Sequence, residues 1–341
     1  MKEFINSLRI SCSVIGAVIG AGFITGREIM RFFYGNSPIL GVIVLFCVLF
    51  ITIYFILKVQ NAKIIFLLEK SSIFIYSLNL LIMASMLGAT DSLAFSLFGL
   101  PTNIPILSIL LLVLSTLLSL NGMDRLTHFN FIIVPVMLAI FFLTIFILPK
   151  SEYVIGKEIV IEKDCFLYGF MNIFLMQPFL LKIKKEKRKF SPFLVSIVSS
   201  IILSVAILLF LGILSDECIS CEVPIILLAR NNIFIYYSVS IVIFLSIFTT
   251  LTSVQYPFYI QDKPFGYLPL IFSAVFSFAV SRIGFYIIVD KIYPLIAVLS
   301  FIYYAFIFAI WLFFFLKGQQ LRTLSPQANI KSRYLPLQDQ A

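Results

Sequence analysis

The chain has few charged residues and almost no histidine or tryptophan. Only 12% of its 341 residues are charged and 61% are hydrophobic, with one histidine and one tryptophan. Soluble domains carry about 25% charged residues, so this composition excludes a soluble globular protein. The apolar runs are long and do not alternate with polar residues, which excludes a transmembrane β-barrel. The sequence therefore predicts an all-α integral membrane protein.

Motifs of common enzymes are also absent. There is no HExxH, GxSxG or Walker sequence, and one histidine cannot build a His-rich electron-transfer ladder. We therefore expect no enzymatic activity and no cofactor, apart from the candidate coupling ion described below. Cysteines are few, and Cys218-x-x-Cys221 lacks the second pair that a metal site would need. A local disulfide and two free thiols are the two interpretations left open for that pair.

Ten apolar segments are candidates for membrane spans, because a helix needs about 20 mostly apolar residues to cross a bilayer. Their approximate limits are 6–34, 38–58, 72–98, 103–120, 128–149, 165–181, 191–214, 225–253, 267–288 and 290–317. The first run has no small-residue cleavage site, so we expect a retained span rather than a signal peptide. Residues 318–341 are polar and predict a disordered cytoplasmic tail.

The distribution of basic residues predicts the orientation. With the N-terminus inside, 17 of the 25 lysines and arginines fall on the cytoplasmic side, six of them between Lys182 and Lys189. This bias places both termini in the cytoplasm. The same basic loop can contact anionic lipid headgroups. The net charge of +9 is therefore a topology signal, and no nucleic acid partner is expected.

The first apolar segment is rich in glycine. Glycine occupies four positions, Gly16, Gly20, Gly22 and Gly26. Each weakens a helix by roughly 1 kcal/mol relative to alanine, and Thr25-x-x-Glu28 has the capping-box pattern of a new helix start. A broken helix at membrane depth is tolerated only in protein or beside a cavity, and it is typical of a transporter's substrate site. Close helix packing through small-xxx-small pairs is the alternative.

A long polar loop between Pro149 and Asp164 divides the ten segments five and five. An odd number of spans per half makes the two halves inverted repeats. We therefore expect one transmembrane domain over 1–317, with repeats over 1–149 and 165–317. Span 6 then corresponds to span 1, and its polar residues and Pro178 predict a second interruption. A simple kink at Pro178 is the alternative.

Several short motifs, in this order, resemble those of the YkvI-like family of uncharacterised bacterial membrane proteins. They are Gly20-Ala-Gly-Phe-Ile-Thr-Gly-Arg-Glu-Ile29, Phe98-Gly-Leu-Pro101, Phe131-Ile-Ile-Val-Pro135, Leu167-Tyr-Gly-Phe-Met-Asn172, Ile247-Phe-Thr-Thr250 and Ile292-Tyr-Pro-Leu295. That family is distantly similar to the amino acid–polyamine–organocation transporters. The resemblance implies a LeuT-like five-plus-five fold with broken helices 1 and 6, in the bacterial cytoplasmic membrane. This chain has Ser246 where an acidic residue is common in relatives.

The resemblance also implies a sodium site between the broken first span and span 8. Its ligands would be the carbonyl oxygens of Gly16, Ile19 and Ser246 and the hydroxyl oxygens of Thr249 and Thr250. Five neutral oxygens suit a hard monovalent cation, and the partial negative charge of a helix C-terminus replaces a carboxylate. The alternative is that the threonine hydroxyls bond back to carbonyls of their own helix.

The predicted substrate site gathers small and polar residues from spans 1, 3 and 6. They are Gly20, Ala21, Gly22, Ser85, Gly88, Asp91 and Asn172. The helix start at the break is expected to favour a substrate carboxylate. Asp91 is an ionisable group within a span, so it is a candidate for binding an amine or relaying protons; a solvated position near the outer interface is the alternative.

Charged residues beyond the break predict an outer gate. Arg27 or Arg31 could pair with Asp290, although a solvated interface cluster is the alternative. Together these features predict a secondary active transporter of a small, amino-acid-like organic solute, coupled to Na⁺ or H⁺ and working by alternating access. A ligand-sensing receptor subunit of the same fold, as in germinant receptors, is the main alternative, and a channel is the third. The expected partners are the solute and the lipid bilayer, and the sequence leaves protein partners undetermined.

Overall fold

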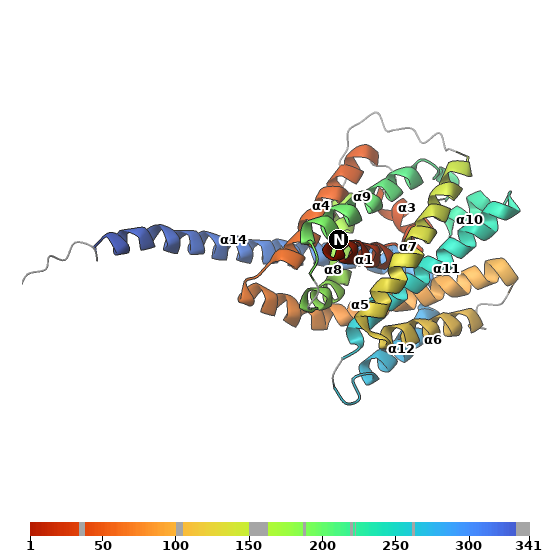
Figure 1. Ribbon diagram of the computed structural model, residues 1–341. Coiled ribbons are helices and arrows are strands. Elements are labelled where there is room, and N and C mark those ends of the chain that lie inside the picture. Colours follow the sequence, from red (N-terminus) through yellow and green to blue (C-terminus); the bar gives the residue numbers. More distant parts are fainter. Residues whose placement is uncertain are drawn as a thin grey trace, which may run out of the picture.

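The computed structural model describes residues 1–33, 38–99, 105–149, 163–186, 189–218, 221, 223–260 and 263–331. All regular elements in these ranges are helical, which confirms the all-α class. Within the described ranges, seven helices are long and apolar enough to cross a membrane, and two shorter apolar helices cover 106–120 and 268–283. The protein is therefore an all-α membrane protein, and its helices pack into one bundle from which the last helix projects (Figure 1).

The helices of the first half run in chain order up to the polar loop, which lies outside the described residues. They are α1 (Lys2–Val18), α2 (Ala21–Ile24), α3 (Arg27–Phe33), α4 (Pro38–Lys58), α5 (Ala62–Phe98), α6 (Ile106–Leu120) and α7 (Gly122–Ile147). The first predicted span is thus divided among three helices.

The second half contains both long helices and short irregular turns. Its helices are α8 (Lys163–Lys185), α9 (Pro192–Leu211), α10 (Pro224–Ala229), α11 (Ile233–Gln255), α12 (Leu268–Val280), α13 (Phe285–Ile287) and α14 (Tyr293–Lys331). Short turns lie at η1 (Asp216–Cys218), η2 (Tyr256–Phe258), η3 (Ser281–Ile283) and the π-helical η4 (Ile288–Ile292).

Side-chain caps fix where three of the long helices begin. The Oδ1 atom of Asn61 accepts from the N–H of Lys63 at 3.0 Å, and Oδ1 of Asn232 accepts from the N–H of Phe234 at 3.0 Å. Ser191 caps α9 in the same way. Such caps satisfy backbone donors that the first helical turn leaves without partners. Helices α5 and α11 therefore start with the same device.

Helices α1 and α8 lie inside the bundle (Figure 1). Helix α1 packs against α7, α9 and α11, whereas α8 packs against α14, α4 and α5. In addition, α6 contacts α11, α12 contacts α5, and α4 contacts α9. These contacts form matching sets: exchanging α1 with α8, α4 with α9, α5 with α11, α6 with α12 and α7 with α14 converts one set into the other.

The predicted interruption of span 6 is wrong, because α8 is one continuous helix through Pro178. Proline removes a single backbone donor, and tertiary contacts around α8 hold the helix together. Gln177 donates to the Leu68 carbonyl of α5 at 2.9 Å and accepts from the Tyr304 hydroxyl of α14 at 3.1 Å. The polar residue that predicted a break is thus a link between neighbouring helices.

Two further expectations concern the ends of the chain and the cysteines. Helix α14 continues to Lys331, into the segment 318–341 that was predicted as a disordered tail, and residues 332–341 lie outside the described part. Of the two interpretations of the Cys218–Cys221 pair, the structure has two free thiols and not a disulfide. Lys182 and Lys184, which the sequence places in the basic loop, lie in the last turn of α8 and donate to the carbonyls of Tyr256 and Ile56.

Candidate functional site

The interruption of the first span has a defined geometry. Helix α1 ends at Val18, and Gly20 has extended backbone angles (φ −94°, ψ −171°) before α2 begins. The N–H of Gly20 donates to the Val18 carbonyl at 2.8 Å. It is therefore not available to the carbonyl of Gly16, its partner in a regular helix. The broken helix expected from the glycine pattern is present.

A second turn of the chain follows α2. Gly26 has φ +85°, a left-handed conformation that glycine adopts without steric cost. The expected capping box at this turn does not form. The Thr25 hydroxyl donates to the Gly22 carbonyl at 3.3 Å and accepts from the Arg27 N–H at 3.4 Å, while the Glu28 carboxylate accepts from the Tyr168 hydroxyl at 2.8 Å. Tertiary contact with α8 thus engages the Glu28 side chain that the capping box would need.

The predicted sodium ligands meet where α1 ends beside α11. The Thr250 hydroxyl lies 3.0 Å from the Gly16 carbonyl oxygen and 3.3 Å from that of Ile19, and it donates to both. The Thr249 hydroxyl donates to the Ser246 carbonyl on its own helix at 3.0 Å. One threonine therefore contacts the break, and the other bonds back as the alternative interpretation expected.

A small cavity lies beside this cluster. Its volume is about 30 Å³, which is room for one or two water molecules. It is lined by residues of α1, α3, α5, α8, α11 and α14 and by Gly20 at the break. The lining residues that carry a polar group or complete the break are Gly20, Glu28, Asn172, Thr250 and Tyr293. Most of the remaining wall is apolar, with three methionines, Met86, Met171 and Met176.

Glu28 is the carboxylate of this cavity. Its side chain is buried, with 4% of the residue exposed. A Cβ atom added at Gly22 would lie 2.1 Å from Glu28 Oε1, so only glycine leaves space for the carboxylate. Asn172 donates to the Tyr168 carbonyl at 3.0 Å. A buried network therefore holds Glu28 between the broken first span and α8.

The structure disperses the seven predicted substrate residues. Gly20 and Asn172 line the cavity, while the Ala21 N–H donates to the Met86 sulfur at 3.2 Å. Gly22 lies against the Glu28 carboxylate. Ser85 reaches the cavity only through Tyr293, with 3.3 Å between their hydroxyl oxygens. Five of the seven residues therefore lie around the cavity. Gly20 and Asn172 line it, and Ala21, Gly22 and Ser85 contact residues that line it.

Gly88 and Asp91 lie further along α5, outside that volume. A Cβ at Gly88 would lie 3.1 Å from the Phe285 nitrogen, so this glycine serves close packing. Asp91 accepts from the Ser108 hydroxyl and pairs with Arg282, with 3.3 Å between charged atoms. The carboxylate of Asp91 is therefore neutralised by η3 and does not reach the cavity.

The ion pair expected between Arg27 and Asp290 is present. Nε of Arg27 donates to Oδ1 of Asp290 at 3.0 Å, and a second guanidinium nitrogen pairs with Oδ2. The guanidinium lies 4.3 Å from the centre of the Tyr286 ring and donates to the Cys221 carbonyl at 3.2 Å. Arg31 instead pairs with Asp164 at 3.7 Å. Arg27 thus joins α3 to the π-helical turn.

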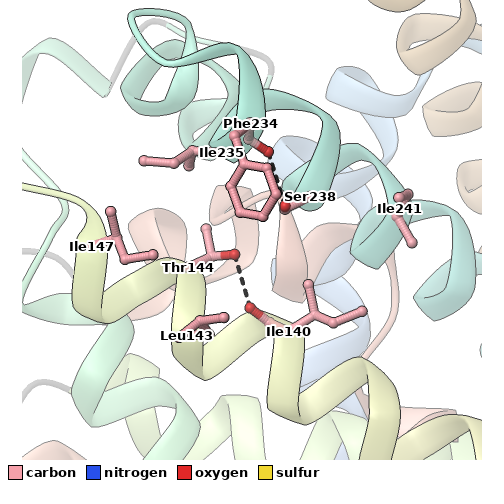
Figure 2. A pocket seen from close by; sticks show the side chains of 8 residues that line it. All are labelled: Ile140, Leu143, Thr144, Ile147, Phe234, Ile235, Ser238 and Ile241. Atoms are coloured by element: carbon pink, nitrogen blue, oxygen red, sulfur yellow. Dashed lines mark hydrogen bonds between the residues drawn. The ribbon is translucent and has the colours of Figure 1, made fainter.

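Two larger hollows lie elsewhere. The groove between α7 and α11 measures about 220 Å³ and is lined mainly by aliphatic side chains, as Figure 2 shows. Its hydroxyls, on Thr144 and Ser238, both donate to carbonyls of their own helices. A wider hollow of about 590 Å³ lies at the ends of α8 and α11. The groove between α7 and α11 is lined by no ionisable group among the described residues, and neither hollow is lined by residues of the broken first span. We therefore prefer the small cavity beside the break as the candidate site.

Sequence reasoning missed three residues of the cavity network. Glu28 was noted only as a capping residue, although an ionisable side chain in the first span was a signal for function. Tyr168 and Tyr293 lie within two of the motifs that carry the resemblance, 167–172 and 292–295, but the motifs assign no role to either side chain. Comparison of the chain with models of known protein families and with characterised proteins yields no match.

Proposed function

We propose that the protein is a ten-span secondary active transporter of a small organic solute, with a LeuT-like pair of inverted repeats. The spans would be the seven long helices, the two shorter apolar helices α6 and α12, and the broken segment α1–α3. The N- and C-termini would lie in the cytoplasm of a bacterium, as the positive-inside bias predicts. The solute is amino-acid-like in this proposal.

The matching sets of helix contacts support the repeat. Five helices of each half exchange their contact partners when α1 is exchanged with α8 and the others follow in order. Five spans per half would invert one repeat relative to the other, as in many transporters. The continuous α8 departs from that pattern, so one broken helix, not two, would form the substrate site.

The observation that carries the proposal is the meeting of Thr250 with the end of α1. Carbonyl groups at a helix C-terminus have no intrahelical donors and carry partial negative charge. Here the Gly16 and Ile19 carbonyls face a hydroxyl of α11 across 3.0 Å and 3.3 Å. Rotation of that hydroxyl would turn a donor into a fourth or fifth oxygen ligand for Na⁺. Non-helical backbone of this kind is tolerated at membrane depth beside a cavity.

Closure around the cavity fits alternating access. The cavity has room for only one or two water molecules, and the Arg27–Asp290 pair ties α3 to η4. A solute would enter only after these elements separate. In this proposal the ion pair is the outer gate, and it is closed in the present conformation.

Thermal unfolding of the purified protein with amino acids and small amines tests the proposal, in Na⁺ and in K⁺ at equal ionic strength. A ligand that binds only the folded state raises its stability by mass action. We expect a solute-dependent shift that is larger in Na⁺, and we expect the Thr249→Ala/Thr250→Ala variant to lose the difference between the two salts. A solute shift that is equal in both salts would contradict sodium coupling.

A further inference from the structure

We propose that Glu28 binds the ammonium group of the transported solute, so that the cavity selects small amine-bearing cations and zwitterions over molecules that carry only a carboxylate. This inference rests on the proposed function in taking the cavity as the solute site. It changes the expected chemistry of that site, because the helix start at the break was expected to attract a substrate carboxylate.

The charge at the break comes mainly from Glu28 and not from helix dipoles. Helix α2 has four residues and α3 has seven, so neither has the length to present a strong dipole. The space beside Gly22, in the first turn of α2, is already filled by the Glu28 carboxylate, to judge from the 2.1 Å between Oε1 and an added Cβ. A second carboxylate here would meet like charge. The local field therefore favours a cation.

The Glu28 carboxylate has a hydrogen-bond donor but no cationic partner among the described residues. Oε2 accepts from the Tyr168 hydroxyl at 2.8 Å, while Oε1 accepts no hydrogen bond from the described residues. Among the described residues that line the cavity, none is a lysine, arginine or histidine. The neighbouring cations on α3 are engaged elsewhere, Arg27 with Asp290 and Arg31 with Asp164. An isolated buried charge is strongly unfavourable, so a charged Glu28 needs a cation from outside.

The cavity wall around the carboxylate is mostly apolar and contains sulfur atoms and an aromatic ring. Met86, Met171 and Met176 supply flexible, polarisable thioethers that adapt to ligands of different shape. Tyr293 adds an aromatic ring, and aromatic faces attract cations. Asn172 completes the lining on α8. A hydrogen-bond acceptor with formal charge, surrounded by soft apolar groups, is suited to an ammonium group on a short carbon chain.

The experiment compares matched probes on the purified full-length protein. Propylammonium, propionate and alanine are titrated at pH 7 and constant ionic strength, and the melting temperature is measured. We expect propylammonium and alanine to raise it and propionate to leave it unchanged. Stabilisation by propionate, or none by either amine, would overturn the proposal.

The matched variants are Glu28→Gln and Glu69→Gln. Glu69 lies away from the cavity and pairs with Lys185, with 3.1 Å between the charged atoms. Its replacement therefore controls for the general loss of a carboxylate. We expect at least a tenfold weaker affinity for propylammonium in Glu28→Gln and an unchanged affinity in Glu69→Gln. Equal amine binding by wild type and Glu28→Gln would contradict the assignment.

A measurement on the wild type covers the case in which Glu28→Gln does not fold. Dicyclohexylcarbodiimide modifies carboxyl groups in apolar surroundings, and peptide mass spectrometry locates the adduct. We expect an adduct at Glu28 that propylammonium prevents and propionate does not. Labelling of Glu28 at the same rate with and without amine would overturn the proposal.

Failure of this inference is distinguishable from failure of the proposed function. Amine binding through Glu28 without solute flux in liposomes would leave the ammonium site standing and remove transport. Sodium-dependent solute flux that is fully retained in Glu28→Gln would support transport and remove the ammonium site at Glu28. The two experiments therefore report on separate claims.

Discussion

The hydroxyl of Thr250 lies 3.0 Å from the carbonyl oxygen of Gly16 and donates a hydrogen bond to it across the contact between α11 and α1. The two residues are 234 positions apart in the chain. The contact exists because the glycine-rich segment ends α1 early and leaves this carbonyl without its regular partner. A weak point in a helix is thereby turned into a polar contact between the two halves.

The first prediction concerns that contact. Thr250→Val keeps the shape of the side chain but removes the hydroxyl, whereas Thr250→Ser keeps the hydroxyl. In K⁺ we expect the valine variant to lose about 0.5–1.5 kcal/mol of stability, the usual net value of one hydrogen bond. We also expect it to lose stabilisation by Na⁺, which the serine variant retains. Thermal unfolding in the two salts measures both effects, and a sodium response preserved in the valine variant would contradict the site.

The second prediction concerns the Arg27–Asp290 pair. Asp290→Asn leaves a largely buried guanidinium without its carboxylate, and breaking a buried pair costs about 3–5 kcal/mol. The control is Asp164→Asn, because the Arg31–Asp164 pair is longer, at 3.7 Å, and more exposed. We expect that control to cost about 0–1 kcal/mol. Denaturant unfolding of both variants measures the difference. Equal losses would mean that the first pair does not hold α3 to η4.

A third prediction follows from the fit between Gly22 and Glu28. Gly22→Ala forces the carboxylate to move, and overpacking of this kind costs about 1–3 kcal/mol. The same change in a Glu28→Ala background meets no carboxylate, so we expect it to cost much less. Unfolding of the wild type, both single variants and the double variant forms a double-mutant cycle. Additive effects would show that the two side chains do not share this space.

The fourth prediction concerns Asp91, which pairs with Arg282 and Ser108 outside the cavity. We expect Asp91→Asn to lower stability by about 1–3 kcal/mol, since a partner of a charged hydrogen bond is lost. We expect solute affinity to stay within about twofold of wild type. Unfolding and ligand titration of the same preparation measure the two quantities. Loss of binding at unchanged stability would instead make Asp91 a ligand-binding residue.

The sequence predicted the helical membrane class and the break at Gly20 because these depend on local composition. Apolar length alone identifies a span, and clustered glycines weaken a helix wherever they occur. Pro178, in contrast, does not interrupt its helix. Its effect depends on contacts from α4, α5 and α14, which the local sequence does not contain, and those contacts keep α8 continuous.

The candidate site was predictable only in part. Thr249 and Thr250 have the helical spacing of one face, so their position on α11 followed from periodicity, and the resemblance supplied the partner on α1. Glu28 was misassigned because Thr25-x-x-Glu28 matches a capping box in sequence. The choice between a local cap and Tyr168 is made by packing over 140 positions of chain. Distant contacts of this kind cannot be read from spacing.

Concentrative uptake is the most direct test of the central claim that the protein is a secondary transporter. Purified protein in sealed liposomes would be given labelled amino acids and short amines, with an inward Na⁺ gradient or with K⁺ on both sides. We predict accumulation above the external concentration in the Na⁺ gradient and its loss in the Thr249→Ala/Thr250→Ala variant. Saturable binding without flux would contradict the account and indicate a receptor, and flux that only equilibrates the solute would indicate a channel.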